Sequence, residues 1–291
     1  MKMKKRMFTL LFVLTAIVAL VAAGCNVQEN GGGDEGEQMR IASVMPSNTE
    51  ILFALGLGDS IVGVTDFCNY PPELEEAVES EKIKRLGDSF NLNEELLVSL
   101  EPDLVLFGFP SDITDRLDEL EITSEVIAPA SIEEIYASIR RIGELTKSES
   151  AAEKLAGDME AAINAVKDKA AALPDGEKPR VLMLLDLDSL YVVGTGILED
   201  ELIAAAGGIN VVTAGGYAQI SEEALIEADP EIILCTFPLR EQILAEKDAW
   251  KEMTAVKDEA IHDLDGDLIN RPGPRLGEGL ELLYGLFHPE S

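Results

Sequence analysis

The feature that most constrains the fold of this chain is an internal repeat. The segment from Glu94 to Leu106 aligns, 128 positions later, with the segment from Glu222 to Leu234. Each copy contains an acidic pair, an apolar helical pattern, an acid-Pro turn and a run of β-branched and aliphatic residues. A chance match between two common helix–strand units is the alternative, which the shared register of these features disfavours. The repeat therefore predicts two lobes built in the same way.

Short β-branched runs alternate with amphipathic stretches along both halves of the chain. Because strands that alternate with helices form mostly parallel sheets with helices on both faces, each half is predicted to be a Rossmann-like α/β lobe. The expected lobes cover residues 40–148 and 174–291, the second beginning at the linker 174–179. The expected strands lie near residues 41–44, 61–64, 104–107, 126–127, 181–185, 190–193, 232–235 and 260–262.

The stretch 149–173 lacks proline and repeats apolar residues every three to four positions, as in Leu155, Met159, Ile163 and Val166. This spacing predicts one long amphipathic helix. At 1.5 Å per residue such a helix spans roughly 37 Å, enough to connect the two lobes. A single stiff connection allows only modest closure of the lobes around a ligand.

The N-terminus has the layout of an export signal. A basic patch, Lys2 to Arg6, precedes an uncharged apolar run that ends in Ala22-Ala23-Gly24-Cys25. We expect a signal peptide at residues 1–24, lipidation of Cys25, and a polar flexible tether at residues 25–39. The protein would then be extracytoplasmic and anchored to the cell membrane by the lipid. An uncleaved transmembrane helix is the alternative, although the run is somewhat short for one.

The charge balance excludes several classes of partner. The chain carries 23 basic and 55 acidic side chains, and loss of residues 1–24 would change the formal charge from −32 to −36. Such a surface repels nucleic acids and anionic headgroups, so we expect no nucleic-acid partner and no membrane contact besides the lipid. A salt-adapted source would produce the same composition.

The sequence contains few residues of the kinds that catalytic and metal sites need. It lacks the Gly-x-Ser-x-Gly, phosphate-binding loop and His-Glu-x-x-His motifs. The two histidines are His262 and His288, too few for a site built on several histidines. Cys68 and Cys235 lie in different halves and are interpreted as small apolar residues. We therefore expect no catalytic residue, no resident metal and no cofactor.

Loops that follow strands are candidate ligand sites, because α/β sheets hold ligands at the carboxyl ends of their strands. After the first strand, Pro46 would end the strand, and Ser47 or Asn48 would cap the next helix. After the second strand, Phe67 and Tyr70 add aromatic side chains. A capped turn without a ligand is the alternative interpretation of the first loop.

Several motifs in order resemble a known family. They are Pro46 to Glu50, Ile61 to Thr65, Asn69 to Pro72, the Glu101 to Val105 turn, and Arg271 to Arg275. Together they resemble the solute-binding proteins of vitamin B12 and iron-siderophore ABC importers, the class III periplasmic binding proteins. The resemblance covers Arg40 to Glu290. It implies two lobes joined by a long helix, a ligand in the cleft between them, and docking on a permease dimer that works with its ATPase.

The expected ligand contacts come from both lobes. Phe67, Tyr217 and Arg271 match positions at which the family contacts ligand, although the first two side chains are substituted. Core packing is the alternative for the aromatic residues, and a salt bridge is the alternative for Arg271. The full set of expected ligand-binding residues is Ser47, Asn48, Phe67, Ser89, Phe90, Tyr191, Tyr217 and Arg271.

The resemblance also implies one docking glutamate in each lobe, which pairs with arginines of the permease. The register of the repeat assigns these to Glu95 and Glu223. Helix-start chemistry accounts for the same residues, because Asn93 and Ser221 can cap the helices and acidic side chains in a first turn offset the helix dipole. The two interpretations are compatible.

The Asn69 to Pro72 and Arg271 to Arg275 runs favour a corrinoid, similar to vitamin B12, as the transported metal chelate. A ferric siderophore or haem is the alternative within the family, although an anionic siderophore would need more basic residues than Arg271, Arg275 and Arg240. From other classes, a surface enzyme or a sensor lipoprotein remains open; a neighbouring permease and ATPase gene pair would favour transport.

Overall fold

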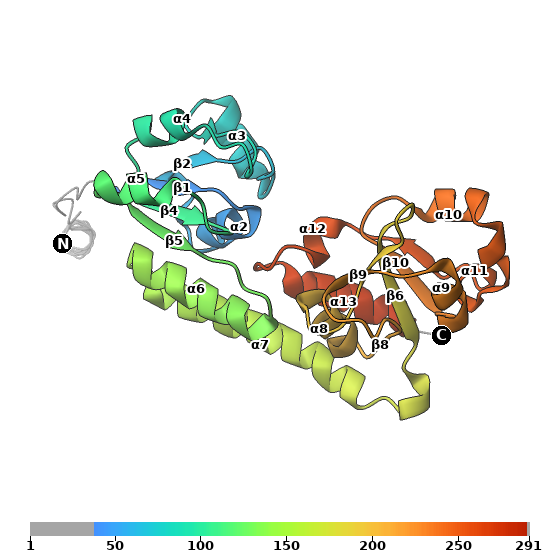
Figure 1. Ribbon diagram of the computed structural model, residues 1–291. Helices are drawn as coiled ribbons and strands as arrows, with labels where there is room; N and C mark the ends of the chain where they lie inside the picture. Colours follow the sequence, from blue (N-terminus) through green and yellow to red (C-terminus); the bar gives the residue numbers. More distant parts are fainter. Residues whose placement is uncertain (1–37, 290–291) are drawn as a thin grey trace, which may run out of the picture. The chain divides into compact units, whose positions relative to one another are not determined.

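Two separate β-sheets organise the part of the chain that the structure, a computed structural model, describes, residues 38–289 (Figure 1). From Met39 onward the chain forms one unit. The expected signal peptide, Cys25 and the tether up to residue 37 lie outside the described residues. Within residues 38–289, no helix combines the length and the apolar character that crossing a bilayer requires.

The sheet of the N-terminal lobe has five strands in the order β3-β2-β1-β4-β5, and every pair in it is parallel. The strands are β1 (Ile41–Ser43), β2 (Ile61–Val64), β3 (Lys84–Arg85), β4 (Leu104–Phe107) and β5 (Thr123–Val126). The intervening helices are α2 (Pro46–Ala54), the 3-10 turn Gly58–Ser60, α3 (Pro72–Glu79), α4 (Glu94–Ser99), α5 (Thr114–Glu119) and α6 (Ile132–Thr146).

The sheet of the C-terminal lobe follows the order β11-β10-β6-β7-β9, and β8 also pairs with β6. Its strands are β6 (Arg180–Asp186), β7 (Tyr191–Val193), β8 (Ile209–Asn210), β9 (Tyr217–Gln219), β10 (Ile232–Cys235) and β11 (Ile261–Asp263). Its helices are α8 (Leu198–Ala205), α9 (Glu222–Ala228), α10 (Arg240–Glu246), α11 (Thr254–Lys257), α12 (Gly266–Ile269) and α13 (Leu276–Phe287), with 3-10 turns at Asp175–Glu177 and Asp248–Glu252.

Both sheets are covered on both faces, as the alternating pattern predicts. In β1, Ile41 belongs to the apolar cluster that includes α7, whereas Ala42 packs in a second cluster on the opposite face. In β10, Ile232 and Ile233 divide in the same way between two clusters. Successive residues of a strand point to opposite faces, so an unbroken apolar run is what a doubly covered strand requires.

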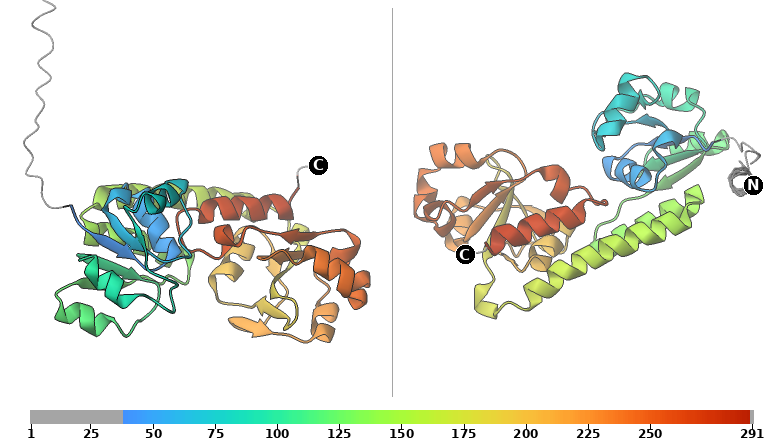
Figure 2. Two further views of the ribbon diagram at one scale, coloured as in Figure 1. Left: turned by 90° about the horizontal axis from the view of Figure 1, so that it is seen from above. Right: turned by 180° about the vertical axis from the view of Figure 1, so that it is seen from behind.

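Helix α7 (Glu149–Ala171) connects the lobes, as predicted. It follows α6 after a tight turn in which Lys147 has a left-handed φ of 56°. A Cβ on Gly143 of α6 would lie 2.4 Å from the Cβ of Ala152, so glycine permits the close approach of the two helices. Beyond this contact α7 packs against α8 and α13 of the C-terminal lobe (Figure 2).

The structure departs from the sequence prediction at sheet edges. The short strands β3, β8 and β9 were not predicted, and β5 begins three residues before the expected position. Edge strands such as β3, Lys84–Arg85, carry polar side chains and so lack the apolar signal. The C-terminal sheet is also mixed, because β7 runs antiparallel to both β6 and β9.

The expected cap of α2 was also wrong. Met45 is the N-cap residue without a side-chain bond, and Pro46 takes the first helical position. Proline is suited to that position because it has no N–H to satisfy and its φ is already helical. Ser47 and Asn48 therefore lie inside the first turn of α2 rather than before it.

Candidate functional site

The loops after β1 and β4 are held together by buried polar side chains. Ser47 and Asn48 are fully buried. The Asn48 Nδ2 donates to the Phe107 carbonyl at 3.1 Å, which joins the start of α2 to the end of β4. The Asn48 Oδ1 has no hydrogen-bond partner among the described residues. Ser47 and Asn48 therefore lie buried beneath the loops, and Asn48 connects the two loops. Their roles as ligand contacts stay predictions.

Ser89 and Phe90 lie in the loop after β3. The Ser89 Oγ donates to the Val44 carbonyl at 3.0 Å, which ties this loop to the end of β1. The Asp88 carboxylate accepts the backbone N–H of Phe90 at 2.7 Å, and the Asn91 side chain bonds the same carboxylate and lowers its pKa. This scaffold holds Phe90 with 82% of its surface exposed and its ring stacked on Phe109, the centroids 5.5 Å apart.

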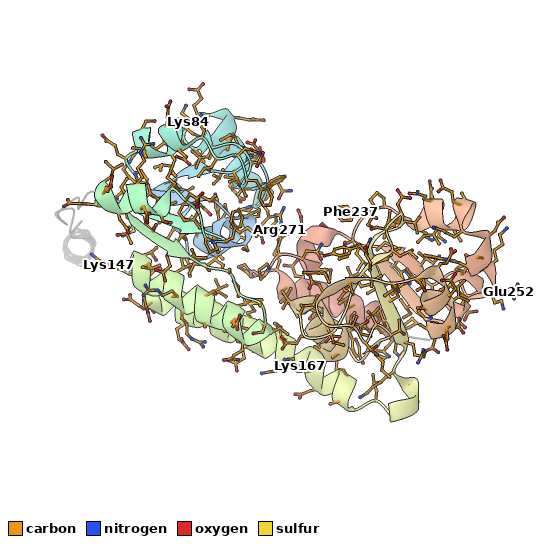
Figure 3. The ribbon with its side chains drawn as sticks, viewed as in Figure 1. Lys84, Lys147, Lys167, Phe237, Glu252 and Arg271 are labelled. Carbon is orange, nitrogen blue, oxygen red and sulfur yellow. The ribbon has the colours of Figure 1, made fainter. Side chains whose placement is uncertain are left out.

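Aromatic side chains also gather on the C-terminal lobe. Tyr191 of β7 and Tyr217 of β9 are diagonal neighbours across an antiparallel pair, so they share a face and stack with their centroids 6.1 Å apart. Phe237, which follows β10, is exposed as well (Figure 3). These rings border a pocket of about 440 Å³, which we call the C-lobe pocket. It is lined by Leu185, Tyr191, Glu199, Tyr217, Phe237 and Asn270.

Glu199 is the buried acid of the C-lobe pocket. Its side chain lies in α8, only 4% of the residue is exposed, and its Oε1 accepts the Tyr217 hydroxyl at 2.8 Å. Its Oε2 has no hydrogen-bond partner among the described residues. Burial raises the pKa of the Glu199 carboxyl, and burial together with the Glu199 charge raises the pKa of the Tyr217 hydroxyl.

Arg271 takes part in an ion cluster that joins the lobes. Its guanidinium donates to the Glu50 carboxylate at 3.0 Å and to Asn69 at 2.7 Å, and it pairs with Asp267 at 2.8 Å. Arg275 donates to both oxygens of the same Glu50 carboxylate, at 2.9 and 2.7 Å. This bonding raises the pKa of Arg275.

The ion cluster gives Arg271 a positioning role. One of its nitrogens also donates to the carbonyl of Phe67 at 3.3 Å, so it holds the loop that carries the exposed Phe67 ring. Figure 3 labels Arg271 at the end of the C-terminal lobe that approaches the N-terminal lobe. The salt-bridge alternative is therefore realised, and direct contact of Arg271 with a ligand stays a prediction.

A larger pocket of about 890 Å³ lies beside the ion cluster. It is lined by α2, α3 and the start of α13, including Glu50, Tyr70 and Arg275. None of the predicted ligand-binding residues lines it. Its lining has two aromatic residues, Phe53 and Tyr70, and five carboxylates, whereas the C-lobe pocket has three aromatic residues and one carboxylate. The smaller C-lobe pocket is therefore the better candidate for an apolar ligand.

The predicted docking residues occupy matching positions. Glu95 and Glu223 are the second residues of α4 and α9, and both are exposed. The predicted caps are confirmed: Asn93 accepts the Leu96 N–H at 3.0 Å, and Ser221 accepts the Ala224 N–H at 3.1 Å. The pKa of Glu223 is lowered by hydrogen bonds from its own backbone N–H and from Ser221.

Three residues of the candidate site, the buried Glu199 among them, were missed from the sequence. The sequence does not distinguish Glu199 from its acidic neighbours Asp200 and Glu201, whereas a sequence pattern could have identified Phe109 and Phe237. These phenylalanines are 128 positions apart, in the register of the repeat, and each is followed by proline. Extending the repeat beyond the strands would have predicted an aromatic side chain at the carboxyl end of both β4 and β10. Among the described residues, no group of three or more His, Cys, Asp or Glu side chains could hold a metal ion.

Comparisons with known proteins agree on one family. The model of the periplasmic binding protein family matches residues 41–268. An uncharacterised ABC transporter substrate-binding lipoprotein of Bacillus subtilis, YvrC, is 34% identical over 263 residues, 88% of this chain and 82% of the relative. A vitamin B12-binding protein of Vibrio cholerae is 26% identical over 251 residues, 83% of this chain and 86% of the relative.

The fold is shared with solved structures. The periplasmic haem-binding protein RhuT from Roseiflexus superposes with a TM-score of 0.75 at 28% identity. The match covers 86% of this chain and all of the other chain. The predicted fold of two lobes with a helical linker is thereby confirmed.

Proposed function

Because the chain belongs to the periplasmic binding protein family, we propose that it captures a corrinoid between its two lobes and delivers it to an ABC permease. The observation that carries this proposal is the presence of partly exposed aromatic rings on both lobes. Phe90 stacks on Phe109, which follows the repeated strand β4, and Phe237, which follows β10, lines the C-lobe pocket with Tyr191 and Tyr217. Flat rings held by stiff scaffolds suit a large planar macrocycle, because they provide contact area at low entropic cost.

The charge of the site favours a neutral ligand over an anionic one. Arg271 and Arg275 are both paired with Glu50, and Asp267 adds a second carboxylate. An anionic siderophore would have to compete with the buried Glu50 and the partly exposed Asp267 for the guanidinium groups. A corrinoid with amide side chains needs no such counter-charge. The relative from Vibrio cholerae that is named for vitamin B12 binding supports the same choice.

Titration of the purified protein, residues 26–291, tests the ligand. We expect saturable cobalamin binding by absorbance and calorimetry, and much weaker binding of haem and of ferric siderophores. Phe90→Ala and Phe237→Ala should each weaken cobalamin binding about tenfold, because each removes an aromatic contact. Leu282→Ala, which truncates an exposed apolar side chain of α13, is the matched control. Absence of cobalamin binding would contradict the corrinoid assignment.

Haem is the second candidate, and one observation favours it. The structure with a TM-score of 0.75 is that of a haem-binding protein, and its identity to this chain, 28%, is similar to that of the vitamin B12-binding relative. Tight haem binding without cobalamin binding in the same titration would select this candidate.

We assign docking on the permease to Glu95 and Glu223. They occupy the same position of the two repeat copies, so a two-fold symmetric permease could pair one arginine with each. Glu95→Gln combined with Glu223→Gln should weaken binding to the permease and leave cobalamin affinity unchanged. Glu119→Gln combined with Glu227→Gln removes two exposed charges from the same lobes as a control. If both double variants bound the permease with the same affinity, Glu95 and Glu223 would have no docking role and would only offset the dipoles of α4 and α9.

We assign the membrane anchor to a lipid on Cys25. Cys25→Ala should release the protein from the membrane fraction during cell fractionation, because the thiol that carries the lipid is lost. Retention of this variant in the membrane fraction would identify residues 7–23 as a transmembrane anchor.

A further inference from the structure

Three acidic side chains open helix α8, and their environments differ. Asp200 accepts the Gly196 N–H at 2.9 Å and the Asn210 side chain at 3.0 Å. Glu201 accepts the Ile132 N–H at 2.9 Å and lies 3.9 Å from Lys167. Glu199 alone is turned inward and lines the C-lobe pocket. Asp200 bonds the loop before α8 and Asn210, and Glu201 bonds the start of α6. Glu199 has a hydrogen-bond partner for only one of its two carboxylate oxygens among the described residues.

The unpartnered Oε2 of Glu199 requires a particular kind of partner. A buried polar atom without a hydrogen bond is unfavourable, so a ligand group that satisfies it gains affinity. When Glu199 is ionised, Oε2 needs a donor; when it is protonated, Oε2 donates and needs an acceptor. Burial raises the pKa of this carboxyl. A primary amide offers N–H and C=O groups and matches either state, whereas a carboxylate matches only the protonated one.

The other walls of the C-lobe pocket offer no positive charge to a carboxylate. Leu185, Tyr191, Phe237 and Asn270 complete the lining with Tyr217, and neither lysine nor arginine is among them. Arg271, the nearest arginine in sequence to Asn270, already pairs with Glu50 and Asp267. A ligand carboxylate in this pocket would therefore lie beside Glu199 without a counter-charge, an arrangement that low dielectric makes costly.

We propose that Glu199 is a specificity-determining residue of the C-lobe pocket, which selects a macrocycle bearing primary amides over one bearing carboxylates. The inference rests on the proposed function and names the ligand chemistry that the same site prefers. Selectivity arises in two ways: an amide satisfies the unpartnered Oε2 in either protonation state, and a ligand carboxylate is repelled by the ionised Glu199. Tyr217 acts as a positioning residue, because its hydroxyl holds the other oxygen and fixes the carboxyl in place.

The test compares two ligands that share the corrin ring. Cobinamide carries its side chains as amides, and cobyrinic acid carries them as carboxylates. The ratio of their dissociation constants is measured at physiological ionic strength for residues 26–291 and for Glu199→Gln. Glutamine keeps an acceptor for the Tyr217 hydroxyl and removes the charge. We expect wild type to prefer cobinamide at least about a hundredfold, and the variant to narrow this ratio at least about tenfold, mainly by binding cobyrinic acid better.

Two further variants separate a local effect from the charge of the whole protein. Glu281→Gln removes an exposed carboxylate of α13 and should leave the ratio unchanged. Glu199→Met removes the carboxyl at similar volume and should narrow the ratio as glutamine does. Folding of each variant is checked by circular dichroism. An unchanged ratio in folded Glu199→Gln or Glu199→Met, or an equal narrowing in Glu281→Gln, would overturn the inference.

Failure of the corrinoid proposal has a different signature. If the protein binds haem and neither corrinoid, the same comparison is made between haem and its diamide. If wild type binds the diamide more tightly than haem and Glu199→Gln reduces that preference, the role of Glu199 is supported although the corrinoid assignment fails. A preference for haem itself in wild type would overturn both. Binding of cobinamide and cobyrinic acid with equal affinity would overturn the role of Glu199 alone.

Discussion

The two lobes share a repeat but present their aromatic side chains differently. In the N-terminal lobe every strand is parallel, and the rings of Phe90 and Phe109 stand on loops that follow strands. The C-terminal lobe adds an antiparallel ladder, β7 with β9, whose tyrosines stack over a buried carboxyl. One lobe thus offers an open apolar surface, and the other offers a pocket with a defined polar group. Contact area can come from both lobes, whereas chemical selectivity belongs to the second.

The lobes also differ in what they contribute to the contact between them. The N-terminal lobe provides one buried carboxylate, Glu50, and the C-terminal lobe provides two guanidinium groups, those of Arg271 and Arg275. The cluster adds a polar connection to the apolar one made by α7, and the bond from the Ile132 N–H to the Glu201 carboxylate adds another. The stiffness expected from a single helix is therefore increased.

The largest expected effect tests this connection. Glu50→Ala leaves two nearly buried arginines without their common partner, and removing one member of a buried ion cluster costs about 3–5 kcal/mol. We expect the free energy of unfolding in urea to fall by about this amount. Glu76→Ala, in the exposed face of α3, is the control and should change it by less than about 0.5 kcal/mol. A loss for Glu50→Ala no larger than that of the control would show that the ion cluster adds nothing to stability.

A smaller effect distinguishes the two stacked tyrosines. Tyr217→Phe removes the hydroxyl that donates to the buried Glu199, so it should lower the free energy of unfolding by about 1–3 kcal/mol. Tyr191→Phe removes a hydroxyl that does not bond Glu199 from a partly exposed residue of the same ladder, and it should change the free energy of unfolding by less than about 0.5 kcal/mol. Both are measured by urea unfolding of the ligand-free protein. Equal losses in the two variants would mean that the Glu199 bond contributes nothing to stability.

The caps test whether the repeat is energetically symmetric. Asn93→Ala and Ser221→Ala each remove the side chain that accepts a backbone N–H at the start of α4 or α9. Each should lower the free energy of unfolding by about 1 kcal/mol. Because the two sites are in different lobes, the double variant should lose the sum of the two values. Unequal losses of unfolding free energy in the two single variants would show that the two copies of the repeat differ energetically despite their similar cap geometry.

The smallest expected effect is a change in the pH dependence of stability. The pKa of Glu199 is raised from its usual 4.5, so the folded protein keeps this proton to higher pH than the unfolded chain does. The free energy of unfolding of wild type should therefore fall as pH rises from about 4.5 through the pKa of the folded state. Glu199→Gln lacks this contribution, so its stability relative to wild type should increase with pH over that window. A constant difference between pH 4 and 8 would contradict the raised pKa.

Much of the fold could be predicted because its signals are local. The β-branched runs gave the central strands, the spacing of Met159 and Ile163 gave α7, and the positions of Asn93 and Ser221 gave two caps. The edge strands could not be predicted, since β3 and β8 have two residues each and lack an apolar run. Helix α2 begins two or three positions earlier than a cap at Ser47 or Asn48 implied, because Pro46 occupies the first helical position.

The candidate site was predicted in part. Phe67, Phe90, Tyr191 and Tyr217 are exposed in the structure, as a binding role requires, whereas Ser47 and Asn48 are buried. Phe109 and Phe237 could have been predicted, because the repeat extends to them. Glu199 was not, since its sequence neighbours Asp200 and Glu201 are also acidic and only burial distinguishes it from them.

The sequence by itself determined the number of lobes, their helix–strand order, the long connection and the equivalent positions of the repeat. These follow from periodicity and capping, which depend on residues a few positions apart. Only the tertiary structure decided which charges meet. Glu50 bonds partners 221 and 225 residues away, and Glu199 bonds a tyrosine that β9 brings to the start of α8. Such pairs depend on how lobes and strands pack, and no local pattern encodes them.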